Sequence, residues 1–535
     1  MTETQTITLL DSTLRDGAQG EQISFSVQDK VHIVQALDEL GIQFIEAGNP
    51  GSNPKDLEFF REIQKIPLAN TKVCAFGSTR RKGIAPEDDG NLQSLLAANT
   101  GTVVFFGKTS VFQVERILRA ELEENLAMIR ETAAFLKGQG RGVIFDAEHF
   151  FDAFKENPDY ALRCLEAAQE GGAETLVLCD TRGGCLPGEI GRITRLAAER
   201  FDSCAEIGVH THNDCGLGVA NSLAAVEAGA RHVQGTLLGF GERTGNANLS
   251  TIIANLELKM NASCLPAGHL ERLTSIVRQV AEIANITLDS GMPYVGHNAF
   301  AHKAGMHIDA VLKDPESYEH IVPETVGNDR VILVSEAAGR AAVLEKIRKF
   351  DPLITKDSPV ASEILKTIKD LEHSGYQFEG AEGSFELLVR KALKRYRPFF
   401  KLHYYKTIGE KPRLDDYLCS FAQLKIEVNG QLEVTAGEGD GPVHALDVAL
   451  RRALERFYPA VSHIRLTDYK VRVLDSQSAT AAKVRVLIES SDGAESWSTV
   501  GVSSDIMEAS WLALVDSIEY YLIYDFERQL GASGQ

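Results

Sequence analysis

The first 260 residues repeat one pattern eight times, and this repetition constrains the fold more than any other feature of the chain. In each unit a short apolar run ends in a polar or glycine-rich turn, and an amphipathic stretch with helical spacing follows, as in residues 26–41. Such runs are typical of strands that are buried on both faces of a parallel sheet. The runs are residues 6–11, 42–48, 72–77, 102–107, 142–148, 175–180, 206–212 and 232–239.

Eight strand–helix units of this length predict an α/β fold with a TIM (β/α)8 barrel. An open, doubly wound sheet shows the same alternation, and the count alone does not separate the two folds. The chemically distinctive residues follow the C-terminal ends of several different runs, where barrel enzymes build their active sites. This placement favours a barrel, which we assign to residues 1–284.

The pattern stops after residue 284, and two further regions follow. We expect residues 285–417 to form a connector and a helical subdomain, and residues 418–535 to form an α+β domain made of two repeated units. At an offset of 64 residues the two copies share a turn signal, a strand and an amphipathic helix. A duplicated module after an enzyme-like barrel predicts a regulatory or dimerising domain. The matched pairs are Thr435/Thr499, Gly437/Gly501, Ala445/Ala509, Ala449/Ala513 and Leu450/Leu514.

Two histidines at the end of the seventh run predict a metal site. His210 and His212 are two residues apart, so in a strand their imidazoles lie on the same face. Asp16 follows the first run, and in a closed ring the first and seventh strands are two positions apart. An Asp-His-His set without a thiolate suits Mg²⁺, Mn²⁺ or Zn²⁺ with open positions for substrate oxygens.

Other polar side chains after the runs supply candidate catalytic and substrate-binding groups. Arg15 offers a forked cation for a carboxylate or a developing enolate. Glu148, after the fifth run, is a candidate general acid or base, and Asp146 lies on the same side two residues earlier, so the choice stays open. Thr181, after the sixth run, is a hydroxyl donor at the mouth of the barrel.

Composition excludes several classes of partner. The chain carries 55 Lys and Arg against 75 Asp and Glu, a formal net charge of −20, which argues against a nucleic-acid-binding protein. No apolar run approaches the roughly 18–20 residues of a membrane span, and the first residues lack the features of a signal peptide. Eight cysteines without a CxxC pair fit reduced thiols, so we expect a cytoplasmic protein.

Two long motifs in the right order resemble those of a known enzyme family. Residues 14–19, Leu-Arg-Asp-Gly-Ala-Gln, followed after ten residues by Lys30, are similar to its first signature, and residues 207–218 are similar to its second. The glycine-rich segment 239–246 extends the likeness. The family is that of the 2-isopropylmalate, homocitrate and citramalate synthases, which condense acetyl-CoA with a 2-oxoacid. The resemblance covers essentially the whole chain.

Within this family, four segments are most similar to the citramalate synthases. Asn49 departs from the aromatic residue expected before the second of these segments. The segments are residues 15–19, 50–54, 293–296 and 500–511.

The resemblance implies a role for each candidate residue. Asp16, His210 and His212 would bind the divalent metal, with Asn246 as a fourth ligand. Arg15 would face the carbonyl of the oxoacid, Thr181 its carboxylate, and Glu148 would transfer a proton. His307 and Tyr318, from the connector, would complete the site, with the partner subunit of a homodimer as their source.

The implied reaction is a Claisen condensation of acetyl-CoA with pyruvate, followed by hydrolysis of the thioester. The resemblance also implies a place in isoleucine biosynthesis and an amino-acid effector at the C-terminal domain. Three alternatives stay open: a 2-isopropylmalate or homocitrate synthase, a metal-dependent aldolase or lyase on the same scaffold, and a non-catalytic regulatory subunit.

Overall fold

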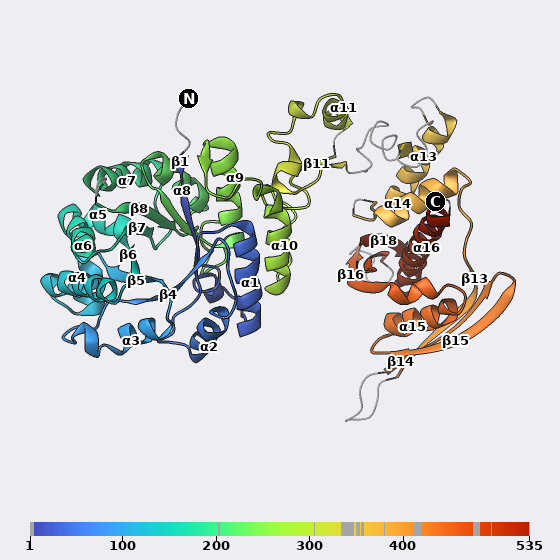
Figure 1. Ribbon diagram of the computed structural model, residues 1–535. Helices are drawn as coiled ribbons and strands as arrows, with labels where there is room; N and C mark the ends of the chain where they lie inside the picture. Colours follow the sequence, from blue (N-terminus) through green and yellow to red (C-terminus); the bar gives the residue numbers. More distant parts are fainter. Residues whose placement is uncertain are drawn as a thin grey trace. The chain divides into compact units, whose positions relative to one another are not determined.

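In the computed structural model, the chain forms two compact units (Figure 1). The first comprises residues 1–300 and 320–331, and the second comprises residues 301–319 and 332–535. The structure describes residues 5–201, 204–303, 305–332, 347–348, 354, 358–378, 380–410, 419–474, 482–493 and 495–533.

Eight parallel strands close into a barrel in the first unit, in the order in which they occur along the chain. Closure is made by β2 against β9, where Thr8 pairs with His232 and Asp11 with Gly235. The predicted barrel is thus confirmed, and an open sheet is excluded. The strands are β2 (Thr8–Asp11), β3 (Phe44–Glu46), β4 (Lys72–Ser78), β5 (Thr102–Lys108), β6 (Gly142–Glu148), β7 (Thr175–Asp180), β8 (Glu206–Thr211) and β9 (His232–Gly235).

Helices surround the barrel and bury one apolar face against it (Figure 1). The first of them shows how the sequence sets the boundaries. Ser26 and Asp29 form a capping box at its start, and Gly41, with φ of 97°, ends it in the left-handed region. The helices are α1 (Val27–Leu40), α2 (Pro54–Ile63), α3 (Gly90–Ala97), α4 (Leu122–Gly138), α5 (Phe150–Glu156), α6 (Pro158–Glu170), α7 (Pro187–Phe201), α8 (Gly218–Glu227), α9 (Leu249–Lys259) and α10 (Leu273–Ile283).

A packed layer of side chains fills the inside of the barrel below its C-terminal mouth. Leu10, Val104, Ile144 and Val177 form one buried cluster there, together with two cysteines. The polar candidate residues lie above this layer, at or beyond the ends of the strands. A short pair of strands, β1 (Gln5–Thr6) and β10 (Ala262–Ser263), lies outside the barrel.

The second unit begins with the connector and continues into helices. The connector contributes β11 (Ala301–His302) and α11 (Gly305–Lys313), and β12 (Val331–Ile332) lies at the boundary between the units. The described part of the helical segment contains α13 (Pro359–His373) and α14 (Glu382–Ala392), whose apolar faces pack together.

Two copies of a three-stranded antiparallel sheet followed by a helix complete the second unit. The first copy is β13 (Lys401–Glu410), β14 (Cys419–Val428), β15 (Gln431–Gly439) and α15 (Pro442–Glu455). The second is β16 (Arg465–Val473), β17 (Val484–Ser491), β18 (Ser496–Ser503) and α16 (Ile506–Ser533). This confirms the predicted pair of repeated units.

The two copies repeat their contacts as well as their order of elements. Thr435 Oγ1 donates to the carbonyl oxygen of Ala449 at 2.7 Å, and Thr499 Oγ1 donates to that of Ala513 at 2.8 Å. Both pairs are related by the offset of 64 residues. The internal repeat therefore preserves the packing of helix against sheet.

The first sheet of the second unit begins earlier than the sequence suggests. Lys401–Glu410 form β13, which pairs with β14, although they lie within the stretch predicted to be helical. Alternating aromatic and polar residues such as Tyr405 and Lys406 suit a half-buried strand. Residues 411–417, expected at the boundary, lie outside the described residues.

No helix in the described part of the chain is both long enough and apolar enough to span a bilayer. The seven cysteines whose side chains the structure describes are all free thiols.

Candidate metal and active site

Asp16, His210 and His212 converge at the C-terminal mouth of the barrel. One ligand atom from each lies within 4.8 Å of the others, and all three side chains are buried. His210 Nε2 is 3.5 Å from Asp16 Oδ2. The cluster has the composition and spacing of a divalent-cation site.

The loop after β2 places Asp16. As expected, Asp16 follows the first strand: β2 ends at Asp11, and Asp16 lies five residues later. Ser12 shapes the turn, because its carbonyl oxygen accepts from the backbone N–H of Gly17 and its hydroxyl accepts from that of Asp16. The two histidines come from the end of β8, as predicted.

The electrostatics keep this cluster ready to bind a cation. Burial alone would raise the pKa of Asp16, but Arg15 and the protonated forms of the two histidines outweigh it and lower the pKa to about 2. Burial, reinforced by His210, lowers the pKa of His212 to about 4. At neutral pH a charged carboxylate therefore faces a neutral imidazole, which is the protonation state that metal binding requires.

Two buried polar atoms beside the cluster support the same assignment. Among the described residues, His212 Nδ1 and Asn246 Oδ1 have no hydrogen-bond partner. Asn246 forms a β-bridge with His212, so its amide lies next to the cluster. Leaving buried polar atoms unpaired is costly, and a bound cation with its water ligands would satisfy them. The residues therefore fit a divalent metal.

The glycine-rich loop after β9 holds Asn246 in place. A Cβ on Gly241 would lie 2.4 Å from Asn246 Nδ2, and a Cβ on Gly245 would lie 2.0 Å from the carbonyl oxygen of Gly239. Only glycine allows the backbone to approach this closely. The loop thus serves to position a side chain at the site.

Arg15 is fixed from three sides. Its Nε donates to Glu46 Oε2 at 2.6 Å, its Nη1 lies 3.1 Å from Asp16 Oδ2, and its Cζ lies 3.8 Å from the centre of the Phe76 ring. Burial opposes the charge, but Glu46 and Asp16 raise the pKa of Arg15 further. The guanidinium is therefore a permanent cation in a fixed orientation, with N–H donors left for a ligand.

One cavity of about 260 Å³ brings these groups together with the other predicted barrel residues. Glu148 lies at the end of β6, where its Oε2 is 2.5 Å from Lys108 Nζ on the neighbouring strand β5. The lining comprises Arg15, Asp16, Gln19, Phe76, Phe106, Asp146, Glu148, Cys179, Thr181, His210, His212, Glu242 and Arg243.

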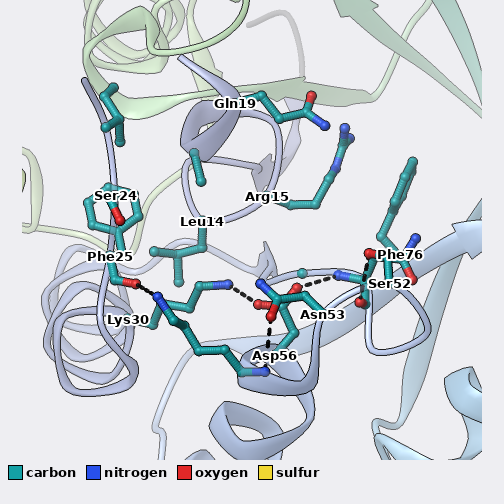
Figure 2. A pocket seen from close by; sticks show the side chains of 15 residues that line it. Leu14, Arg15, Gln19, Ser24, Phe25, Lys30, Ser52, Asn53, Asp56 and Phe76 are labelled. Carbon is teal, nitrogen blue, oxygen red and sulfur yellow. Dashed lines mark hydrogen bonds and ion pairs between the residues drawn. The ribbon is translucent and has the colours of Figure 1, made fainter. Parts of the chain in front are cut away.

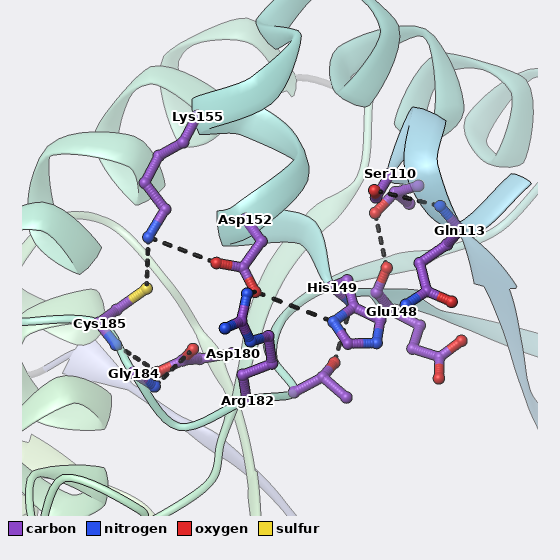
Figure 3. Close-up of polar contacts among 12 residues, drawn as sticks. Ser110, Gln113, Glu148, His149, Asp152, Lys155, Asp180, Arg182, Gly184 and Cys185 are labelled. Atoms are coloured by element: carbon purple, nitrogen blue, oxygen red, sulfur yellow. Dashed lines mark hydrogen bonds and ion pairs between the residues drawn. The ribbon is translucent and has the colours of Figure 1, made fainter. Parts of the chain in front are cut away.

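Thr181 keeps a free donor for this cavity. Its hydroxyl oxygen accepts a hydrogen bond from the backbone N–H of His149 at 2.9 Å, which leaves its O–H available to donate. Asp180 supports the same loop by accepting from the backbone N–H groups of Gly184 and Cys185, and Figure 3 shows this loop beside Glu148 and His149.

A second cavity of about 310 Å³ shares Arg15, Gln19 and Phe76 with the first (Figure 2). A buried ion pair forms one wall of it: Lys30 Nζ lies 2.6 Å from Asp56 Oδ1. Asp56 Oδ2 also accepts from the backbone N–H of Asn49, which fixes the loop after β3. The two cavities give the site room for a substrate longer than a small oxoacid.

The two connector residues lie together in the second unit. His307 is exposed on α11, and Tyr318 follows a short 3-10 turn; their ring centres are 4.3 Å apart. Tyr318 is half exposed. Their predicted role in the site stays a prediction.

Two buried polar residues of the barrel were missed by sequence reasoning. Glu46, at the end of β3, holds Arg15, and Gln234, on β9, contacts His210. Both lie within apolar runs that predict buried strands. A charged residue at the end of a buried run, the signal that identified Glu148, would also have found Glu46.

Family models match nearly all of the chain. An "HMGL-like" model matches residues 6–280, a "Homocitrate synthase post-HMGL domain-like" model matches residues 294–375, and a "LeuA allosteric (dimerisation) domain" model matches residues 379–522.

Relatives of similar length agree with these matches. The (R)-citramalate synthase of Geobacter sulfurreducens is 49% identical over 516 residues, 96% of this chain and 97% of that protein. That of Synechocystis sp. is 50% identical over 533 residues, 97% of each chain. A 2-isopropylmalate synthase of Clostridium kluyveri is 30% identical over 534 residues, 98% of this chain and 99% of that protein.

Proposed function

The chain belongs to the family of the (R)-citramalate synthases, and from this membership we propose that it condenses acetyl-CoA with pyruvate to form citramalate and CoA. The observation that carries the proposal is the cavity in which Asp16, His210 and His212 face Arg15 and Thr181. It offers a cation site, a fixed guanidinium and a hydroxyl donor, which together suit a 2-oxoacid.

Asp16, His210, His212 and Asn246 would hold the divalent metal, whose chemistry is to polarise the oxoacid carbonyl as a Lewis acid. Thr181 donates a hydrogen bond from its hydroxyl group to the substrate carboxylate. Arg15 presents N–H donors to the carbonyl oxygen, where negative charge develops as the new carbon–carbon bond forms. Because Glu46 and Phe76 hold Arg15 in advance, little reorganisation is needed in the transition state.

A base must remove a proton from the methyl group of acetyl-CoA before this bond forms. The resulting enolate carbon attacks the ketone carbon of pyruvate, and the alkoxide then takes up a proton. Water hydrolyses the thioester of the product and releases CoA as a thiol. Glu148 transfers protons from its place beside Lys108, and we assign His307 and Tyr318 to the same proton transfers from the connector of a partner subunit.

We extend the proposal to regulation and assembly. The match of residues 379–522 to an allosteric (dimerisation) domain supports a homodimer and an amino-acid effector at the C-terminal units. Isoleucine is the effector expected for a citramalate route, which places the reaction in the biosynthesis of that branched-chain amino acid. The free thiols of the described cysteines accord with a cytoplasmic enzyme.

Release of free CoA thiol tests the reaction directly. The full-length protein with Mg²⁺, Mn²⁺ or Zn²⁺ is assayed with acetyl-CoA and each of pyruvate, 2-oxoisovalerate and 2-oxoglutarate. We expect pyruvate to give the highest kcat/KM, with citramalate as the product. Preference for either other oxoacid, or cleavage of citramalyl-CoA without condensation, would contradict the proposal.

A further inference from the structure

A chain of two hydrogen bonds lies directly behind His210 inside the barrel. His210 Nδ1 is 2.9 Å from Gln234 Oε1, and Gln234 Nε2 donates to Asp146 Oδ1 at 2.9 Å. All three residues are at most 4% exposed. His210 and Gln234 are paired neighbours on β8 and β9, whereas Asp146 lies on β6, so the second bond crosses the interior.

The chemistry of the amide fixes the direction of this chain. A glutamine side chain has one donating nitrogen and one accepting oxygen. Because the nitrogen of Gln234 donates to Asp146, its oxygen must face His210. That oxygen can only accept, so the proton of the imidazole sits on Nδ1. The lone pair of His210 Nε2 is then directed toward Asp16, 3.5 Å away.

We propose that Gln234 and Asp146 are positioning residues that hold His210 in the Nδ1–H tautomer and thereby set the affinity of the Asp16–His210–His212 cluster for a divalent cation. The inference rests on the proposed metal site. A metal-binding imidazole usually donates its other N–H to such a partner, and losing that partner typically costs 10–100-fold in metal affinity.

The contrast between the two histidines supports this role. His212 Nδ1 has no hydrogen-bond partner among the described residues, so no contact at that nitrogen selects its tautomer, whereas Gln234 contacts His210 Nδ1. His210 is therefore the ligand whose tautomer the surrounding protein controls. The two hydrogen bonds need only an acceptor oxygen at position 146, so they do not depend on the charge of Asp146.

Binding of Mn²⁺ alone to the full-length protein tests the inference without any catalytic assay. Titration calorimetry gives the affinity, and thermal unfolding without metal reports folding. Gln234→Met keeps the length of the side chain but removes both hydrogen bonds. We expect it to bind Mn²⁺ about 10–100-fold more weakly than the wild type, with a cooperative unfolding transition retained.

A swapped pair separates orientation from packing and charge. Gln234→Glu alone places two carboxyl groups in contact and should weaken binding. With Asp146→Asn added, the new glutamate at position 234 accepts from His210 and also accepts from the amide at position 146. The Mn²⁺ affinity of the double variant should therefore recover to within about threefold of the wild type. Asp146→Asn alone should also stay within about threefold, because its amide oxygen still accepts from Gln234.

Three results would overturn the inference: Gln234→Met binding Mn²⁺ within twofold of the wild type, a double variant no tighter than Gln234→Glu, or a loss of affinity in Asp146→Asn as large as in Gln234→Met. If Gln234→Met does not fold, the comparison of Gln234→Glu with the double variant decides. Asp16→Ala is the control for the site itself. Wild-type affinity in Asp16→Ala would overturn the proposed metal site, which distinguishes that failure from a failure of the tautomer control.

Discussion

Replacing Arg15 by lysine tests the proposed role of its guanidinium most directly. Arg15→Lys keeps the positive charge but removes the planar fork. A lysine ammonium cannot make the Nε contact with Glu46 and the Nη1 contact with Asp16 in the same geometry, and it loses the stacking on Phe76. The donor that meets the developing charge on the substrate oxygen is then no longer held in place.

The magnitude follows from the loss of one oriented donor. Removing a preorganised donor to an oxyanion typically lowers kcat by about 10²–10³, equivalent to about 2.7–4 kcal/mol of transition-state stabilisation. We expect a decrease of this size in kcat/KM for pyruvate. The retained charge still offsets Glu46, so the free energy of unfolding should fall by less than the roughly 3–5 kcal/mol seen when one partner of a buried ion pair is removed.

The assay is steady-state thiol release with pyruvate varied and acetyl-CoA saturating, accompanied by urea unfolding of the metal-free protein. Arg182→Lys is the matched control, because Arg182 lies on the rim with a side chain that is 73% exposed and should change kcat/KM by less than about twofold. An Arg15→Lys enzyme within threefold of wild type would refute the reasoning that a fixed guanidinium stabilises the transition state.

Three further changes test other parts of the structure. Gly241→Ala should displace Asn246 and weaken Mn²⁺ binding by about tenfold, measured by calorimetry, whereas Gly184→Ala, where an added Cβ meets open space, should not. Burial lowers the pKa of His232 to about 3, so the free energy of unfolding should fall by about 2 kcal/mol between pH 7 and pH 5, because the imidazole of the unfolded chain takes up a proton. His232→Gln should therefore gain stability relative to wild type by that amount in urea unfolding at pH 5 compared with pH 7; an unchanged difference would contradict the shift. Gly501→Ala should destabilise the second repeat in thermal unfolding by more than about 1 kcal/mol, since an added Cβ would lie 2.0 Å from the carbonyl oxygen of Ala509. The control is Gly441→Ala, just before α15, where the backbone is extended and an added Cβ meets open space.

The barrel could be predicted because each of its strands is buried on both faces. Such strands are short uninterrupted apolar runs, and the helices between them have a different period, so the order of elements can be read directly. The count of eight did not prove closure. Closure depends on the pairing of β2 with β9, a contact between residues more than 200 positions apart that no local pattern encodes.

The site could be predicted only where its residues follow the strands. His210 and Thr181 stand out because a polar side chain ends an apolar run. Glu46 and Gln234 lie within such runs, and each contacts a residue that another strand carries or that the loop after it carries. Their partners become visible only once the strands are arranged in a ring. The contacts that orient a ligand are therefore harder to predict than the ligand itself.

The active-site cavity holds more carboxylates than cations. Asp16, Glu46 and Asp146 all lie close enough to Arg15 to affect one another electrostatically. One guanidinium does not offset three carboxylates, and burial together with the charge of Glu46 raises the pKa of Asp146. A divalent cation at the Asp16–His210–His212 cluster would restore the balance and lower that pKa again. In a chain with a net charge of −20, this cation and Arg15 are what would allow an anionic oxoacid to approach.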